Sequence, residues 1–135
     1  MEIGFFILIG IAVAVIISRN IHDSNEAVTS VSTAGGMRFK YATLLSHILS
    51  GHVDSRIYVE TRTYIKAGVS NYGGTTMFYI QQCPGNIVMI DYEVSNNPVS
   101  PNFTLHFKFD DRMDQNLMMV KIAERVQERM INTFG

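Results

Sequence analysis

The chain has 135 residues, enough for one domain of ordinary size rather than two. Its 11 basic and 12 acidic side chains give a formal net charge of -1. This balance argues against a protein whose main task is to grip nucleic acid, because phosphate binding needs a surplus of Lys and Arg. The single cysteine, Cys83, excludes an intramolecular disulfide and a cysteine-based zinc site.

The N-terminal segment is strongly apolar. Residues 3–17 carry no polar side chain, and residues 1–18 would span about 27 Å as an α-helix, close to the roughly 30 Å of a bilayer core. A cleaved signal peptide and a buried core helix are the alternatives. The first should begin with positive charge, whereas only Glu2 is charged before the run, and the second should have a polar face. We therefore predict a single-pass signal-anchor helix over residues 1–18, held in the bilayer by residues 3–18.

Positive charge beside this segment predicts its orientation. No Lys or Arg precedes it, whereas Arg19 follows it directly and Arg38 and Lys40 lie further along. The positive-inside rule then places the rest of the chain in the cytoplasm.

Small residues recur along the expected anchor at Gly10, Ala14 and Ser18. Spacing of four residues allows two membrane helices to approach closely, which makes a homo-oligomer or another helix–helix contact a secondary hypothesis. Small residues are also common in membrane helices that make no such contact, and this simpler explanation is preferred.

A polar segment and then an amphipathic helix follow. Residues 19–36 are rich in Ser, Thr, Asn and Gly, a composition typical of a linker, so a folded domain is predicted over residues 37–135. Apolar residues with helical spacing open this domain and predict its first helix: Met37, Tyr41, Leu44, Leu45 and Ile48.

Four strands are expected next, because apolar and polar side chains alternate along each of them. Their expected bounds are residues 56–67, 75–82, 87–94 and 103–109. Phe103, Leu105, Phe107 and Phe109 should face the core from the last strand, and Thr104, His106 and Lys108 should face outward. The sheet therefore has one face on a core and one toward water or a partner.

An amphipathic helix closes the chain over residues 111–134, with Asp111 or Asp114 as its N-cap. Short connections between consecutive strands favour an antiparallel meander, and both amphipathic helices bury their apolar stripes most economically on the same sheet face. The predicted fold class is α+β: an N-terminal transmembrane helix followed by an α-β-β-β-β-α two-layer sandwich with a four-stranded antiparallel meander.

The first expected strand carries the strongest signal for an interaction. Its polar face is a row of aromatic and charged side chains: Arg56, Tyr58, Glu60, Arg62, Tyr64 and Lys66. Tyr and Arg are enriched at protein interfaces, and such a row could also stack nucleic-acid bases. Asp91 and Glu93 can face the same way and cancel part of the positive charge, which favours a protein partner over nucleic acid. An ordinary solvated sheet face is the simpler alternative.

No catalytic, cofactor or metal site is predicted. The side chains that could carry chemistry are His47, His52 and Asp54 around the end of the first helix, the thiol of Cys83, and the strand pair Asp91 and Glu93. The histidines lack the spacing of metal ligands, and no local motif supplies the base that a catalytic thiol needs. Paired carboxylates can act as acid and base, but they are also typical of a water-facing strand.

The leading functional hypothesis is a membrane-tethered, non-enzymatic module that presents its open sheet face or a sheet edge to another protein. The first alternative is a small-ligand or lipid-binding domain with a pocket between sheet and helices lined by Met and Phe. The second is a minor structural subunit of a membrane complex. The last is an enzyme whose site is assembled from residues far apart in the sequence.

Overall fold

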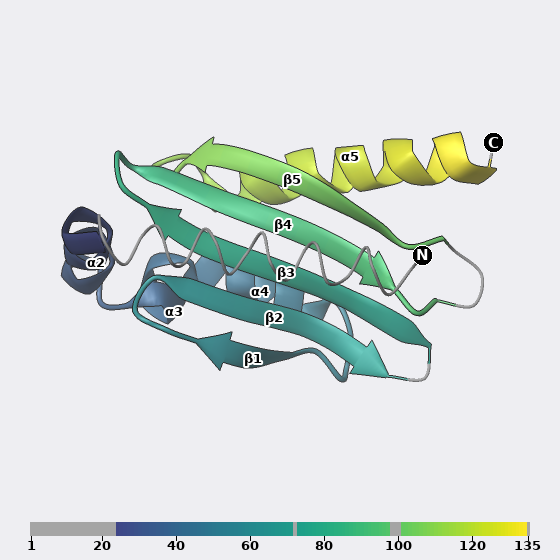
Figure 1. Cartoon of the computed structure of the whole chain (residues 1–135), viewed down its shortest axis with the longest axis horizontal. Helices are drawn as coiled ribbons and strands as arrows, with labels where there is room; N and C mark the ends of the chain where they lie inside the picture. Colours follow the sequence, from purple (N-terminus) through teal and green to yellow (C-terminus); the bar gives the residue numbers. More distant parts are fainter. Residues whose placement is uncertain (1–23, 72, 98–100, 135) are drawn as a thin grey trace.

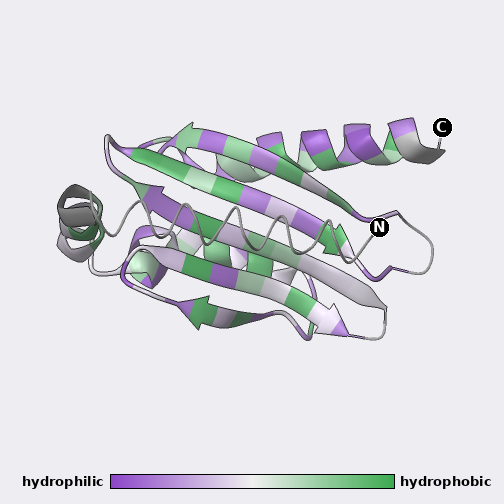
Figure 2. Cartoon of the chain, viewed as in Figure 1, coloured by the Kyte–Doolittle hydropathy of each residue, from purple (hydrophilic) through white to green (hydrophobic). Residues whose placement is uncertain are grey.

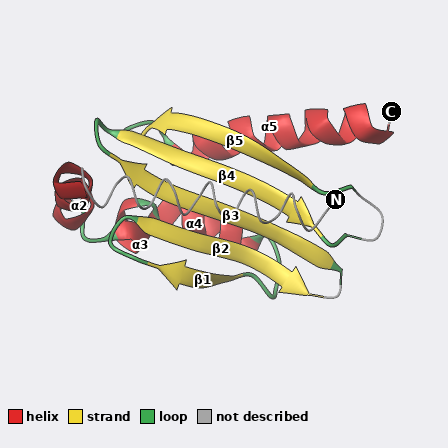
Figure 3. Ribbon diagram, in the orientation of Figure 1, coloured by secondary structure: helices red, strands yellow, loops and turns green. Residues whose placement is uncertain are grey.

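The structure is a computed structural model that describes residues 24–71, 73–97 and 101–134 (Figure 1). The described helices are α2 (Ser24–Thr33), α3 (Met37–Lys40), α4 (Ala42–Ser50) and α5 (Gln115–Phe134). The strands are β1 (Arg56–Glu60), β2 (Tyr64–Asn71), β3 (Gly74–Cys83), β4 (Ile87–Ser95) and β5 (Phe103–Asp110). They pair in chain order, each antiparallel to the next. Helices α3, α4 and α5 lie on one side of the sheet, with α2 beyond one end (Figure 3).

The α+β class and the antiparallel meander are confirmed, but the expected four strands are wrong, because the sheet has five. The segment predicted as one strand, residues 56–67, is a hairpin that turns at residues 61–63. The Thr61 N–H donates to the Tyr64 carbonyl (2.7 Å), and the Thr63 N–H donates to Thr61 Oγ1 (3.3 Å). This turn has no Gly, Pro or Asn, and threonine favours strands, so the sequence alternation runs through it unbroken.

A β-bulge in β1 also changes which side chains share a face. Ile57 pairs with Ala67 and Val59 pairs with Lys66, so Tyr58 is the extra residue on β1. Beyond the bulge the alternation is reversed. Glu60 therefore lies on the helix side, where its Oε1 is 2.5 Å from Nε of Arg38 on α3.

The helix expected at Met37 is interrupted at Tyr41, whose φ of -109° and ψ of 30° separate α3 from α4. Gln115 stabilises this break from a distant part of the chain. Its Oε1 accepts a hydrogen bond from the Leu44 N–H (2.9 Å), and its Nε2 donates to the Lys40 carbonyl (2.7 Å). One side chain thus satisfies a backbone donor of α4 and a backbone acceptor of α3, in the manner of a helix cap.

Part of the expected linker is helical, since α2 lies within residues 19–36. Ala27 and Val31, one helical turn apart, are buried, and Val31 belongs to the hydrophobic core. Ser30 Oγ accepts a hydrogen bond from Nζ of Lys40 (2.5 Å). Helix α2 therefore packs against the domain, while the domain boundaries at residues 18 and 36 stay predictions.

The expected anchor over residues 1–18, with Gly10, Ala14 and Ser18, lies outside the described residues. Within residues 24–134, none of the described helices is long and apolar enough to cross a bilayer. Membrane attachment and the cytoplasmic orientation stay predictions.

The core lies between the sheet and helices α4 and α5. One row of paired side chains crosses strands β2, β3, β4 and β5: Ile65, Ile80, Ile90 and Phe107. All four are buried, as are Leu44, Leu45 and Ile48 of α4 and Met118 and Ile122 of α5. The alternation of apolar and polar residues along β5, visible in Figure 2, confirms the faces predicted for this strand.

Candidate functional site

The outer face of the sheet, opposite the core, brings together titratable side chains from all five strands. Period-two alternation directs these residues away from the helices, because their strand neighbours face the core. We define the outer-face cluster as Tyr58, Tyr64, Lys66, Tyr79, Asp91, Glu93 and His106. In the described part of the chain, no helix packs on this face (Figures 1 and 3).

Four members of the cluster form one cross-strand row over β2, β3, β4 and β5. In order they are Lys66, Tyr79, Asp91 and His106. The ammonium of Lys66 lies 5.6 Å from the Tyr79 ring centroid, a cation–π distance. At the other end, His106 Nδ1 is 2.8 Å from Oδ1 of Asp91. Cross-strand pairs of this kind hold polar side chains in fixed positions on the pleated surface.

Glu93 lies beside this row and is 4% exposed. The Tyr79 hydroxyl donates to its Oε1 at 2.7 Å. Burial raises the pKa of Glu93 above the ordinary range, and the charge of Asp91 adds to that rise, whereas the Tyr79 hydrogen bond and Lys66 oppose it. Burial also raises the pKa of Tyr79 and of Tyr64, so both phenols stay protonated and able to donate at neutral pH.

A hollow of about 430 Å³ opens next to these groups on the outer face. Tyr58 and Tyr79 contribute aromatic walls, Glu93 a carboxylate and Lys66 an ammonium, while Met77 is apolar. The Arg56 guanidinium lies 4.8 Å from the ring centroid of Tyr58. The hollow therefore offers aromatic surface together with both signs of charge.

The six residues predicted as an interaction face are not all brought together. Tyr58, Tyr64 and Lys66 lie on the outer face, with Arg56 stacked on Tyr58. Two depart from it because of the bulge and the turn. Glu60 faces the helices, and Arg62 lies in the turn after β1, beside a separate hollow that includes Glu60. Tyr64 is only 5% exposed, so little of its side chain is available to contact a partner.

Asp91 and Glu93 face the same way as Lys66, as the sequence suggested. The predicted interaction face lacks Tyr79, although the alternation of β3 places Tyr79 on the outer face between Phe78 and Ile80 of the core. His106 has no acidic side chain within three residues of it in the sequence. Its partner Asp91 is 15 residues away and becomes its neighbour only through the β4–β5 register.

The other side chains considered for catalysis or metal binding make polar contacts within the fold. His47 Nε2 is 2.7 Å from Oδ1 of Asn116, and His52 Nδ1 accepts a hydrogen bond from the Asp54 backbone N–H (3.0 Å). The Cys83 thiol is 3.8 Å from the carbonyl oxygen of Gln81. Over the described ranges, no three His, Cys, Asp or Glu side chains are grouped closely enough to hold a metal ion.

Comparison of the chain with protein-family models, curated proteins and solved structures gives no match. Function is therefore inferred from the geometry of the residues themselves and not by analogy from a fold.

The raised pKa of Glu93 predicts a pH effect on stability. Between the ordinary glutamate pKa of 4.5 and the raised folded value, the folded chain keeps a proton that the unfolded chain releases, so the Glu93 contribution to stability falls as pH rises through that window. Glu93→Gln removes this loss. We expect the free energy of unfolding of the variant, relative to the wild type, to increase from pH 4 to pH 8 in urea titrations.

Tyr79→Phe is the companion variant, since it removes the hydrogen bond that lowers the pKa of Glu93. The stability loss with rising pH should then extend to higher pH than in the wild type. A Glu93→Gln difference that stays flat or decreases with pH would contradict the assignment.

Proposed function

We propose that this protein is a membrane-tethered, non-enzymatic interaction module that binds a protein partner through the outer face of its sheet. The observation that carries the proposal is the hollow beside the outer-face cluster, where two tyrosine rings, an ammonium and a buried carboxylate meet. Interfaces are enriched in tyrosine, and rigid aromatic side chains give contact area at low entropic cost. The tether is the signal-anchor predicted at residues 1–18.

The charges of the cluster favour a protein over nucleic acid. On the outer face the carboxylates of Asp91 and Glu93 lie among the cations Arg56, Lys66 and Lys108, and His106 is paired with Asp91. A nucleic-acid surface needs a positive groove, whereas this face offers both signs of charge with aromatic rings between them. A polar or basic side chain of a partner, entering the hollow between Tyr58 and Tyr79, would meet the Glu93 carboxylate.

The proposal is tested by site-specific photo-crosslinking in the native cells. A photoreactive phenylalanine analogue replaces Tyr58 in the full-length chain, an aromatic-for-aromatic change that leaves the hollow lined as before. We expect a discrete protein adduct on irradiation, identified by mass spectrometry after purification.

Phe39 is the matched control position, because it is also aromatic, is 75% exposed, and lies on α3 on the helix side of the sheet. The same analogue there should not give the Tyr58 adduct. No protein adduct from Tyr58, or the same adducts from both positions, would reject the outer face as the binding surface. Deleting residues 2–18 tests the tether separately, since the adduct should then be lost along with membrane recovery.

A further inference from the structure

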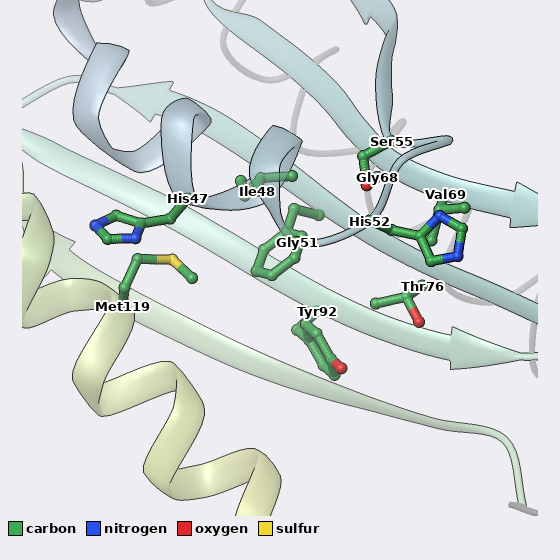
Figure 4. A pocket seen from close by; sticks show the side chains of 11 residues that line it. His47, Ile48, Gly51, His52, Ser55, Gly68, Val69, Thr76, Tyr92 and Met119 are labelled. Carbon is green, nitrogen blue, oxygen red and sulfur yellow. The ribbon is translucent and has the colours of Figure 1, made fainter.

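A second cavity, of about 320 Å³, lies on the helix side of the sheet, away from the outer-face cluster (Figure 4). It forms because α4 ends at Ser50 while β2, β3 and β4 continue beyond it. The part of the sheet beyond the end of α4 is therefore bordered by α5 and by the connection from α4 to β1, rather than covered by a helix. The cavity does not depend on the function proposed for the outer face.

The floor and one end of this cavity are apolar. Phe78 and Tyr92 are cross-strand neighbours whose rings meet edge to face, with centroids 5.0 Å apart. Ile48 comes from α4 and Met119 from α5. Figure 4 shows Met119 at one end of the cavity, next to His47, which is already hydrogen-bonded to Asn116. Apolar area here can be removed from water by a ligand.

The opposite end of the cavity is polar. Figure 4 shows His52, Ser55 and Thr76 together on that side. His52 Nδ1 accepts a hydrogen bond from the Asp54 N–H, so a neutral His52 ring carries its proton on Nε2 and can donate there. Ser55 and Thr76 line the same end of the cavity, and their hydroxyls can also donate. Three donors are therefore available at one end of an apolar cavity.

The volume suits a small molecule. A water molecule takes about 30 Å³ in the liquid, so the cavity has room for roughly ten groups of water or methylene size. Apolar walls at one end and three donors at the other match a short chain with an oxygen-bearing head. We propose that this cavity binds a small amphipathic carboxylate about the size of octanoate, with its chain over Phe78 and Tyr92 and its carboxylate at His52, Ser55 and Thr76.

The test is an NMR titration of the full-length chain in lipid nanodiscs, with the methionine methyl groups labelled with ¹³C. Octanoate is the probe. We expect the Met119 methyl signal to shift and saturate, because Met119 lines the apolar end. A charge-assisted hydrogen bond from His52 should be worth about tenfold in affinity, so His52→Ala should weaken octanoate binding by about that factor.

Matched variants distinguish binding of octanoate in the cavity from partition of octanoate into the lipid of the nanodisc. Thr76→Leu fills the cavity and should abolish the Met119 shift, whereas Thr75→Leu, one residue earlier on β3 and on the outer face, should leave it unchanged. Octanol tests the head group and should bind several-fold more weakly than octanoate. A Met119 shift that is missing, or that persists in Thr76→Leu, overturns the site. Equal affinity for octanol, or no effect of His52→Ala, overturns the carboxylate assignment.

Discussion

Replacing Gly68 with alanine is expected to lower the free energy of unfolding by about 3–5 kcal/mol, from the combined cost of backbone strain and overpacking. Gly68 lies in β2 with a φ of +155°. A Cβ there would lie 2.2 Å from the Thr76 carbonyl oxygen and 2.9 Å from the Met77 Cα. Both are backbone atoms of the paired strand β3, so the clash is relieved only by separating β2 from β3.

The measurement is urea unfolding of the full-length chain followed by far-UV circular dichroism, since the sequence has no Trp to report by fluorescence. Gly85→Ala is the matched control. Gly85 also has a positive φ (+79°), but an added Cβ there meets only the Ile87 Cδ1 at 4.0 Å, so its cost is the backbone strain alone, about 1 kcal/mol. Equal losses for the two variants would show that the contact with β3 is not the cause.

Lys40→Met is the second change with a large expected effect, a loss of about 3–5 kcal/mol from breaking a buried ion pair. The side chains of Lys40 and Asp111 are 13% and 3% exposed, with Nζ 2.8 Å from Oδ2. The same Asp111 oxygen accepts a hydrogen bond from Gln82 Nε2 (3.0 Å), and the hydroxyl of Tyr41 donates to Gln82 Oε1. Removing the ammonium leaves a buried carboxylate at the centre of this network.

The double variant Lys40→Met with Asp111→Asn tests whether the two charges act as a pair. An asparagine oxygen can still accept from Gln82, and neither charge is left buried alone, so the double variant should lose less than the sum of the two single variants. Asp110→Asn is the exposed comparison, because its salt bridge with Arg112 lies at the surface and should matter little. Additive losses for Lys40 and Asp111 would contradict the pairing.

The hydrogen bonds around Asp111 also show why the N-cap of α5 could be assigned only from the structure. The sequence offered Asp111 or Asp114 as the N-cap of α5. The structure gives that place to Asp114, whose Oδ1 accepts from the Asn116 N–H at 3.1 Å, while Asp111 binds Lys40 and Gln82. Both residues have the chemistry of a cap, and only the position of Lys40, 71 residues earlier, separates their roles.

For a similar reason, only part of the candidate site could be predicted from the sequence. Alternation within a single strand places Lys66, Asp91 and Glu93 on the outer face, because the neighbours of each along its strand face the core. The Tyr79–Glu93 hydrogen bond depends on the register between two strands, which no local pattern specifies.

The sequence by itself determined the elements that must bury one face. These are α4 and α5, which carry apolar stripes, and β3, β4 and β5, along which apolar and polar residues alternate. Both patterns follow from local geometry and from the cost of exposing apolar side chains. Tertiary structure alone decided the turn at residues 61–63, the bulge at Tyr58 and the break at Tyr41. The break depends on a distant partner, since Gln115 Nε2 donates to the Lys40 carbonyl across 75 residues, and the bulge depends on the register of β1 against β2. The turn is closed by local hydrogen bonds and joined to β3 by the Gln82 N–H, which donates to the Thr63 carbonyl at 2.8 Å. Backbone groups left unpaired by such irregularities must find hydrogen-bond partners wherever the fold supplies them, and local sequence does not record where that is.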